Sequence, residues 1–234
     1  MKNKKAAQVE AKRKHKTELL AAKARRRGEP LLERSAPTKE VKPTILIVCE
    51  GANTEPSYFK QFKLTSATIR ALGNGKNTLS LVKQAIKLRD EGNFEEVWCV
   101  FDKDIFPAQD FNAAITLAEA NGFKVAYSNQ AFEYWFILHF EDHQGGGMNR
   151  SEYNDTINEH LEPFALTYDG TGSKLVSQDL FEVLMSNEND GRLRVNLAID
   201  RAKRNYDLCD HVSPATEEST TTVFKIVKEI QKYM

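Results

Sequence analysis

Residues 44–62 read TILIVCEGANTEPSYFKQF and decide the fold class. The stretch opens on a continuous apolar run rich in β-branched residues, Thr44–Cys49, which is typical of a strand covered on both faces. A helix is then expected from Glu55 to about Phe62, with Thr54 as its N-cap. A buried strand followed directly by a helix is the unit from which parallel α/β sheets are built.

The alternation of strands and helices continues to residue 140. Further strands are expected at Ala67–Leu72, Glu96–Phe101 and Phe123–Ser128, and further helices at Asn77–Glu91, Asp110–Asn121 and Ala131–Phe140. The first of these helices is expected to bury one face that carries Leu79, Val82, Ile86 and Arg89. The pattern predicts an α/β fold with a mostly parallel sheet and helices on both faces.

The pattern changes after residue 140. A loop at Gln144–Asn149 contains three consecutive glycines, and helical patterns follow at Glu152–Leu161, Gln178–Met185, Leu193–Leu208 and Thr220–Tyr233. No further strong strand is predicted, so this part is interpreted as a helical elaboration packed on the sheet. The predicted organisation is a basic N-terminal arm over 1–42 and one domain over 43–234, with its core at 44–140 and the elaboration at 141–234.

Charge is distributed unevenly along the chain. Lys+Arg and Asp+Glu are both 33, but residues 1–42 hold 14 basic against 5 acidic residues, which leaves 19 against 28 in the rest. A basic arm of this kind is expected to contact the phosphate backbone of a nucleic acid. The alternative is a solvated tail that folds back on the acidic body. No apolar run approaches the roughly 20 residues of a membrane span, so a cytoplasmic protein without membrane contact is expected.

Polar residues follow three of the predicted strands. Glu50 follows the first, Asp102 and Asp104 follow the strand at 96–101, and Asn129 comes just after the strand at 123–128. Ligands of parallel sheets bind beyond the carboxyl ends of the strands. Carboxylates gathered there repel one another unless a hard cation compensates them. Mg²⁺ or Mn²⁺ is therefore expected on Asp102 and Asp104, with Glu50 as a further ligand or as the general acid or base.

The turn after the first strand favours a phosphate ligand. Gly51 lets the backbone turn tightly, and Thr54 at the start of a helix places N–H groups where a phosphate can dock. Two alternatives share this acidic edge: a receiver-like regulatory module and a haloacid-dehalogenase phosphatase. Both fit less well, because they place their acidic residues after the first strand of the fold.

Three motifs resemble the RloB-like family in order and spacing. Residues 50–59, EGANTEPSYF, resemble its Glu-Gly-x-x-Thr-Glu-x-x-Tyr-Phe opening; residues 101–104, FDKD, resemble its second motif; and residues 128–140, SNQAFEYWFILHF, resemble its third. A glutamate after one strand and an Asp-x-Asp after a later one also looks like the Toprim catalytic core. The resemblance implies a Toprim-like metal-dependent endonuclease in prokaryotic anti-phage defence, acting on RNA, with tRNA as an analogy, or on DNA, beside an AAA-type ATPase.

Other side chains have a functional and a structural interpretation. Glu133 is weighed as an additional metal or proton-transfer residue, whereas His139 is more typical of a core histidine. Glu55 suits the first turn of a helix by charge alone, although the motif makes it a site candidate. Lys174, beside a Gly-rich loop, is weighed as a phosphate ligand or a solvated lysine. Five basic residues of the C-terminal part have two interpretations, a surface that binds nucleic acid or an ordinary solvated helix face: Arg192, Arg194, Arg201, Lys203 and Arg204.

Overall fold

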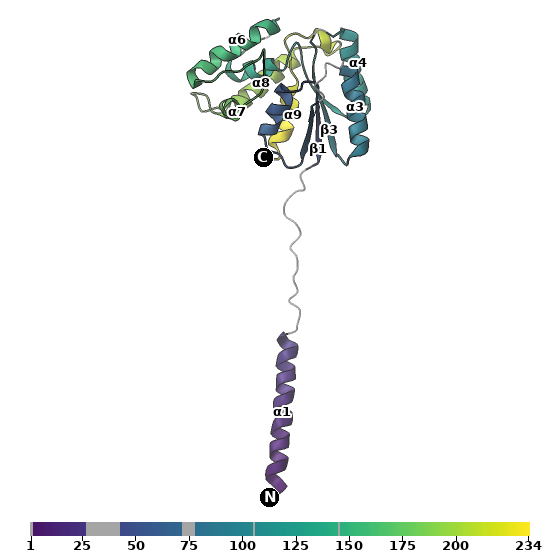
Figure 1. The fold of residues 1–234 in the computed structure, drawn as a ribbon, viewed down its shortest axis with the longest axis vertical. Helices are drawn as coiled ribbons and strands as arrows, with labels where there is room; N and C mark the ends of the chain where they lie inside the picture. Colours follow the sequence, from purple (N-terminus) through teal and green to yellow (C-terminus); the bar gives the residue numbers. More distant parts are fainter. Residues whose placement is uncertain (1, 27–42, 72–77, 105, 145) are drawn as a thin grey trace. The chain divides into compact units, whose positions relative to one another are not determined.

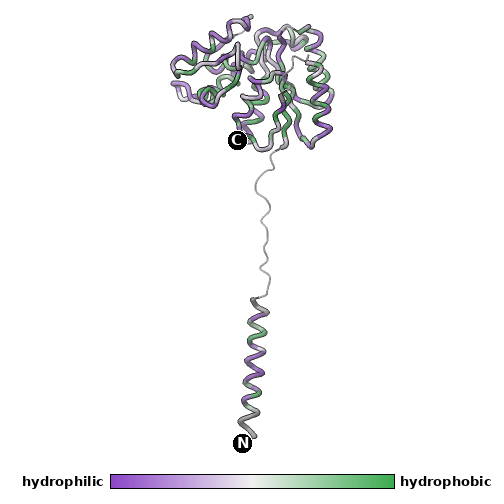
Figure 2. The backbone as a smooth tube through the Cα atoms, in the orientation of Figure 1, coloured by the Kyte–Doolittle hydropathy of each residue, from purple (hydrophilic) through white to green (hydrophobic). Residues whose placement is uncertain are grey.

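The computed structural model describes residues 2–26, 43–71, 78–104, 106–144 and 146–234. The chain divides into two compact units, Met1–Val41 and Lys42–Met234. In the first unit, helix α1 (Lys2–Arg26) accounts for the basic arm as far as it is described, and the rest of the arm lies outside the described residues. Most of the helix is polar (Figure 2). Among its described residues the large apolar side chains, Val9, Leu19 and Leu20, are exposed. No helix in the described ranges is long and apolar enough to cross a membrane.

The second unit is built on a four-stranded sheet (Figure 1). The strands β1 (Ile45–Cys49), β2 (Ala67–Ala71), β3 (Glu96–Asp102) and β4 (Lys124–Ser128) lie in the order β2-β1-β3-β4. All three pairings are parallel. The predicted strands and the parallel α/β class are therefore confirmed, apart from Leu72, which lies outside the described residues.

Helices cover both faces of the sheet because side chains alternate along each strand. Leu46 and Val48 point into a core shared with α3 (Thr78–Glu91) and α4 (Ala108–Ala120). Ile45 and Ile47 point into a larger core on the other face. That core includes α2 (Thr54–Gln61) and α5 (Glu133–Phe140), and α5 is buried along nearly its whole length. This explains why the α5 sequence is apolar all round rather than amphipathic.

The C-terminal part adds helices to the larger core, as predicted. These are α6 (Arg150–Leu161), α7 (Gln178–Met185), α8 (Arg194–Asp207) and α9 (Val223–Gln231), with short 3₁₀ turns η1 (Glu162–Phe164) and η2 (Pro214–Thr216). They contribute Tyr153, Leu180, Ala198 and Val227 to the same hydrophobic cluster as the sheet. The elaboration therefore shares one core with the α/β unit.

Two local predictions are wrong. Asn53, not Thr54, precedes α2, and the Thr54 hydroxyl is used by buried groups of the site, so it does not cap the helix. In α3 the buried face carries Leu81, Val82 and Ala85, because both the sheet and α4 cover that side. Arg89 was expected on this face, and its guanidinium lies instead over the ring of Phe123.

Candidate functional site

The strand order creates a crevice between the ends of β1 and β3. The chain leaves β1 through α2 toward β2 on one side, and α3 then returns it to β3 on the other side of β1. Neighbouring loops that depart toward opposite faces open a gap at the carboxyl edge, where parallel sheets bind ligands. Glu50 follows β1 and Asp102 ends β3, so both lie at this point.

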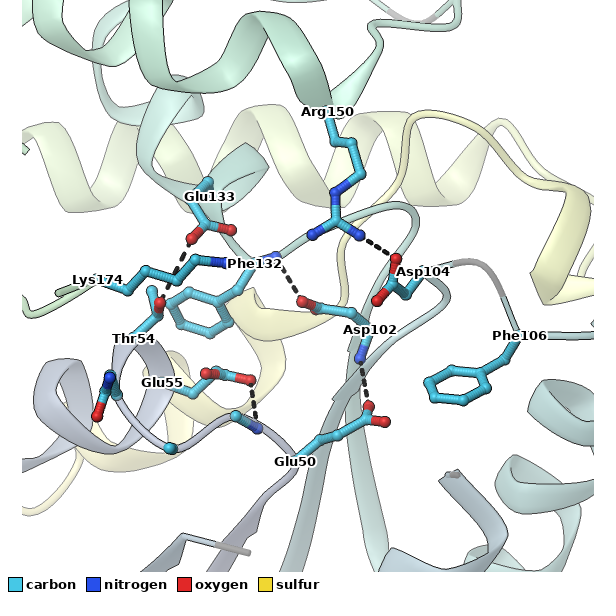
Figure 3. A pocket seen from close by; sticks show the side chains of 13 residues that line it. Glu50, Thr54, Glu55, Asp102, Asp104, Phe106, Phe132, Glu133, Arg150 and Lys174 are labelled. Atoms are coloured by element: carbon cyan, nitrogen blue, oxygen red, sulfur yellow. Dashed lines mark hydrogen bonds and ion pairs between the residues drawn. The ribbon is translucent and has the colours of Figure 1, made fainter. Parts of the chain in front are cut away.

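A cavity of about 300 Å³ occupies the crevice (Figure 3). It contains eight of the ten predicted site residues: Glu50, Gly51, Thr54, Glu55, Asp102, Asp104, Glu133 and Lys174. The remaining wall consists of Ala52, Asn53, Phe106, Phe132 and Arg150. Five acidic side chains and two basic ones therefore line the cavity.

Asp102 is half-buried as a residue, but one oxygen of its carboxylate is enclosed. Its Oδ2 accepts a hydrogen bond from the backbone N–H of Phe132 at 3.0 Å, whereas its Oδ1 is buried and has no partner among the described residues. The backbone N–H of Asp102 donates to Oε2 of Glu50 at 3.3 Å, which joins the ends of the two central strands. A buried carboxylate oxygen without a donor is unfavourable, and it is a position that a cation can satisfy.

Burial and mutual repulsion raise the pKa values of the acids. Burial raises the pKa of Glu50 to about 7, and the charges of Glu55 and Asp104 add to the effect. Burial and then the charge of Glu133 raise the pKa of Glu55 to about 7, although the N–H of Gly51, 3.2 Å from its Oε1, and the charge of Lys174 oppose the shift.

The pKa of Asp102 is raised well above its ordinary range, first by burial and then by the charges of Glu55 and Glu133. Such shifts mark groups that exchange protons near neutral pH or that meet a cation.

Glu133 is fixed by two hydroxyl groups. Its Oε1 accepts from the hydroxyl of Tyr168 at 2.8 Å and from that of Thr54 at 3.3 Å, and these two hydroxyl oxygens lie 3.2 Å apart. Tyr168 belongs to the C-terminal elaboration, so this contact ties the elaboration to the acidic crevice. The sequence offered no signal for Tyr168, because nothing near residue 168 indicates which strand end it meets.

The two cations come from separate elements. Arg150, the first residue of α6, forms an ion pair with Asp104, whereas Lys174 follows the Gly-rich loop and pairs with no carboxylate of the described chain. Figure 3 shows the two side chains approaching the acids from different sides. The sequence does not point to Arg150, since a helix start carries no sign of the distant strand that it reaches.

Two predicted site residues lie outside the cavity. Asn129 is buried, and its amide donates to the carbonyl of Pro214 at 2.7 Å, which fixes η2 beside the end of β4. His139 is fully buried in α5, where its Nδ1 donates to the carbonyl of Trp135 at 2.8 Å. Burial lowers the pKa of His139 to about 3. His139 is therefore a neutral core histidine, the structural alternative in the sequence analysis.

The basic residues of the C-terminal part are engaged in contacts of their own. Arg192 pairs with Asp190, Arg194 with Glu188, Lys203 with Asp207 and Arg204 with Asp142, and Arg201 donates to the carbonyl of Leu138. These contacts leave little unpaired positive charge there, which favours the interpretation as an ordinary helix face.

The donor set fits a hard cation only in part. In the described ranges, no three acidic, histidine or cysteine side chains converge on one metal position, and Asp104 pairs with Arg150. Mg²⁺ however needs only one or two carboxylates and completes its shell with waters and phosphate oxygens. The unpartnered Oδ1 of Asp102 is one such donor, and Glu50 lines the same cavity.

Fold and site together define an α/β protein with an acidic crevice at the switch point of a four-stranded parallel sheet. The family model of RloB-like proteins matches residues 45–230, and the chain belongs to the RloB-like protein family. No curated protein and no solved structure matches the chain. The match extends over the C-terminal elaboration, so Arg150 and Tyr168 lie inside the family region.

Proposed function

We propose that the protein is a metal-dependent nuclease that hydrolyses phosphodiester bonds of RNA or DNA in this crevice. The observation that carries the proposal is the unpartnered buried oxygen of Asp102 in a cavity that Glu50 also lines, at the switch point of the sheet. A glutamate after one strand and an Asp-x-Asp after the neighbouring strand is also the arrangement that resembles a Toprim core. An acidic site that is unstable without a cation suits an anionic substrate accompanied by a metal ion.

Asp102 would hold Mg²⁺ or Mn²⁺ through its Oδ1, and Asp104 would join it when it is released from Arg150. When bound, such an ion stabilises the negative charge that develops on phosphate oxygens and lowers the pKa of a water molecule. Asp102 suits this role because its backbone and its Oδ2 are already fixed by hydrogen bonds. Only its Oδ1 remains for a new contact.

Glu50 and Glu55 are suited to proton transfer. A group with a pKa of about 7 is present in both protonation states at neutral pH, so it can take a proton from an attacking water and return one to a leaving oxygen. Glu50 is half-buried, whereas Glu55 is buried and accepts a hydrogen bond from Gly51. Glu50 is therefore our candidate for the general base.

The biological setting follows from the family resemblance. We propose a cytoplasmic effector of anti-phage defence that acts beside an AAA-type ATPase, and the basic helix α1 would bind the phosphates of the nucleic acid. The Gly51 N–H is already bonded to Glu55. Phosphate binding is therefore assigned to the cations of the cavity rather than to this turn.

Cleavage of total cellular RNA and of plasmid DNA tests the proposal. The purified chain is incubated with Mg²⁺ or Mn²⁺ and with a chelator, and wild type is compared with Asp102→Asn, Glu50→Gln and the exposed control Glu159→Gln. Cutting that needs the metal, is lost in the first two variants and survives in the control supports the nuclease. Cutting that survives Asp102→Asn contradicts it. Co-expression with a neighbouring ATPase repeats the comparison under conditions of activation.

A second candidate is a nucleic-acid-binding module without catalysis that partners an ATPase. It is favoured by the absence of three converging metal ligands in the described part of the chain and by the basic helix α1. This candidate predicts binding of nucleic acid that Asp102→Asn leaves unchanged, and no cutting with the ATPase present. The two candidates therefore differ in the response of one variant.

A further inference from the structure

We propose that Arg150 is a phosphate-binding residue of the crevice, and that it exchanges Asp104 for a phosphate group of the bound nucleic acid. The inference rests on the proposed function, since it takes the substrate to be a nucleic acid. Arg150 is not part of any of the three motifs, and it reaches the cavity only because the start of α6 lies above the end of β3 (Figure 3).

The contact between Arg150 and Asp104 is easily exchanged. The two side chains are 39% and 37% exposed, and ion pairs as exposed as this contribute little to stability. Asp104 adopts a backbone φ of +40°, a left-handed conformation that aspartate tolerates better than most residues. The pair is therefore not needed to hold the fold together.

The guanidinium of Arg150 has donors to spare. Within the described residues only Asp104 accepts a hydrogen bond from it, through Nη1. An arginine side chain carries five N–H donors in a fixed planar fork, which matches two oxygens of one phosphate. A phosphate at the cavity mouth can therefore take more hydrogen bonds from Arg150 than Asp104 does.

The backbone under Arg150 is fixed, so only the side chain has to move. Its N–H donates to Oε1 of Gln130 at 2.8 Å, and Gln130 lies just beyond the end of β4. The preceding residue, Asn149, caps α6 by accepting from the N–H of Ser151 at 3.0 Å. These contacts connect the helix start to the loop after β4 and hold Arg150 above the acids.

Lys174 provides a second cation for the same ligand. Its backbone is left-handed, with φ +53°, and its N–H donates to the carbonyl of Asp169 at 2.9 Å. The Asp169 carboxylate accepts from the N–H groups of Gly172 and Ser173 at 2.8 and 2.7 Å, which shapes the turn before the lysine. Because Lys174 has no ion pair in the described chain, it is available to a second phosphate.

The charge balance explains why the exchange is needed. The ionised carboxylates of the cavity repel an incoming phosphate, and Lys174 alone does not offset them. Arg150 contributes its full charge to the phosphate only when it leaves Asp104. Asp104 then has a free carboxylate that can bind a divalent cation, so phosphate and cation are expected to bind together.

Thymidine 3′,5′-bisphosphate, which carries two phosphates on one sugar, is the probe for this site. Calorimetric titration of the full chain in the presence of Ca²⁺ is expected to give saturable binding. Arg150→Gln should weaken the binding about tenfold or more, which is the range for a lost hydrogen bond to a charged group. Arg150→Lys keeps the charge but loses the planar fork, so its affinity for the probe should lie between those of wild type and Arg150→Gln.

Arg192→Gln is the matched control. Arg192 also forms an exposed ion pair with an aspartate, Asp190, but it lies outside the cavity. This variant should bind like wild type, and circular dichroism checks that all variants are folded. Absence of saturable binding by wild type, or equal binding by Arg150→Gln and wild type, overturns the proposal.

The titration is independent of hydrolysis. If binding of the probe depends on Arg150 but the chain cuts no nucleic acid, the nuclease proposal is contradicted and the phosphate-binding proposal is supported. If Arg150→Gln cuts nucleic acid as wild type does, the phosphate-binding proposal is contradicted and the nuclease proposal is supported.

Discussion

Replacing Glu55 with glutamine should stabilise the protein, and the gain should depend on pH. Glu55 is almost completely buried among other acids, and its pKa is raised from 4.5 to about 7. Ionised Glu55 therefore costs the folded state on the order of 3 kcal/mol relative to the protonated form. Glutamine keeps an oxygen for the Gly51 N–H and removes the charge.

The sign follows from proton linkage. The folded state binds the Glu55 proton more tightly than the unfolded state does, so wild type loses stability as the pH rises from 4.5 to about 7. At about pH 8 the variant should be more stable by about 3 kcal/mol, and at about pH 4 the two proteins should be equal. For a unit of this size the gain corresponds to roughly 6–12 °C in melting temperature.

Thermal unfolding followed by circular dichroism at both pH values, with chelator present, measures the effect. Glu159→Gln, at an exposed position of α6, is the matched control and should leave the melting temperature unchanged at both pH values. An equal gain at both pH values would show that the effect does not come from the charge. A loss of stability at about pH 8 would show that the acids of the crevice do not destabilise the fold.

Three further outcomes follow from the same contacts. Mg²⁺ should raise the melting temperature of wild type at about pH 8, because an ion that binds only the folded state stabilises that state. The increase should be smaller for Asp102→Asn. Differential scanning calorimetry with and without chelator measures both shifts, and equal shifts would argue against Asp102 as a ligand. His139 has a pKa of about 3 in the folded state, so on acidification the unfolded state takes up the proton first. Between about pH 7 and pH 5 the free energy of unfolding of wild type should therefore fall by about 2 kcal/mol more than that of His139→Leu. Urea unfolding at the two pH values measures the difference, and equal decreases would contradict a buried neutral histidine. Tyr168→Phe removes the hydroxyl that donates to Glu133 and should lower the free energy of unfolding by about 1 to 3 kcal/mol. Tyr233→Phe, at a half-buried tyrosine near the C-terminus, should lower it by less. Chemical unfolding compares the two variants, and equal decreases would show that the contact with Glu133 adds no stability.

Much of the fold was predictable because its signals are local. A continuous apolar run such as Ile45–Cys49 has to be covered on both faces, and a sheet of such strands joined by helices has few arrangements. The acids at the ends of β1 and β3 were predictable for the same reason, since all parallel strands end at one edge.

The order of the strands was not determined by these signals. The sequence placed Glu50 and Asp102 at the same edge, but only the order β2-β1-β3-β4 makes them neighbours. The sequence also proposed Asn129 and His139 for the site. In the folded protein the Asn129 amide donates to the carbonyl of Pro214, and the buried His139 donates to the carbonyl of Trp135, so neither side chain faces the cavity.

The sequence by itself determined the parallel α/β sheet and the carboxylates at its edge, since strand periodicity and strand ends are properties of short segments. Only the tertiary structure decided which distant groups meet those carboxylates. Arg150 reaches the crevice and Tyr168 reaches Glu133 in its wall because the C-terminal helices bury their apolar faces against the sheet. Where those helices settle depends on the packing of the whole core, which no local pattern near residues 150 or 168 encodes.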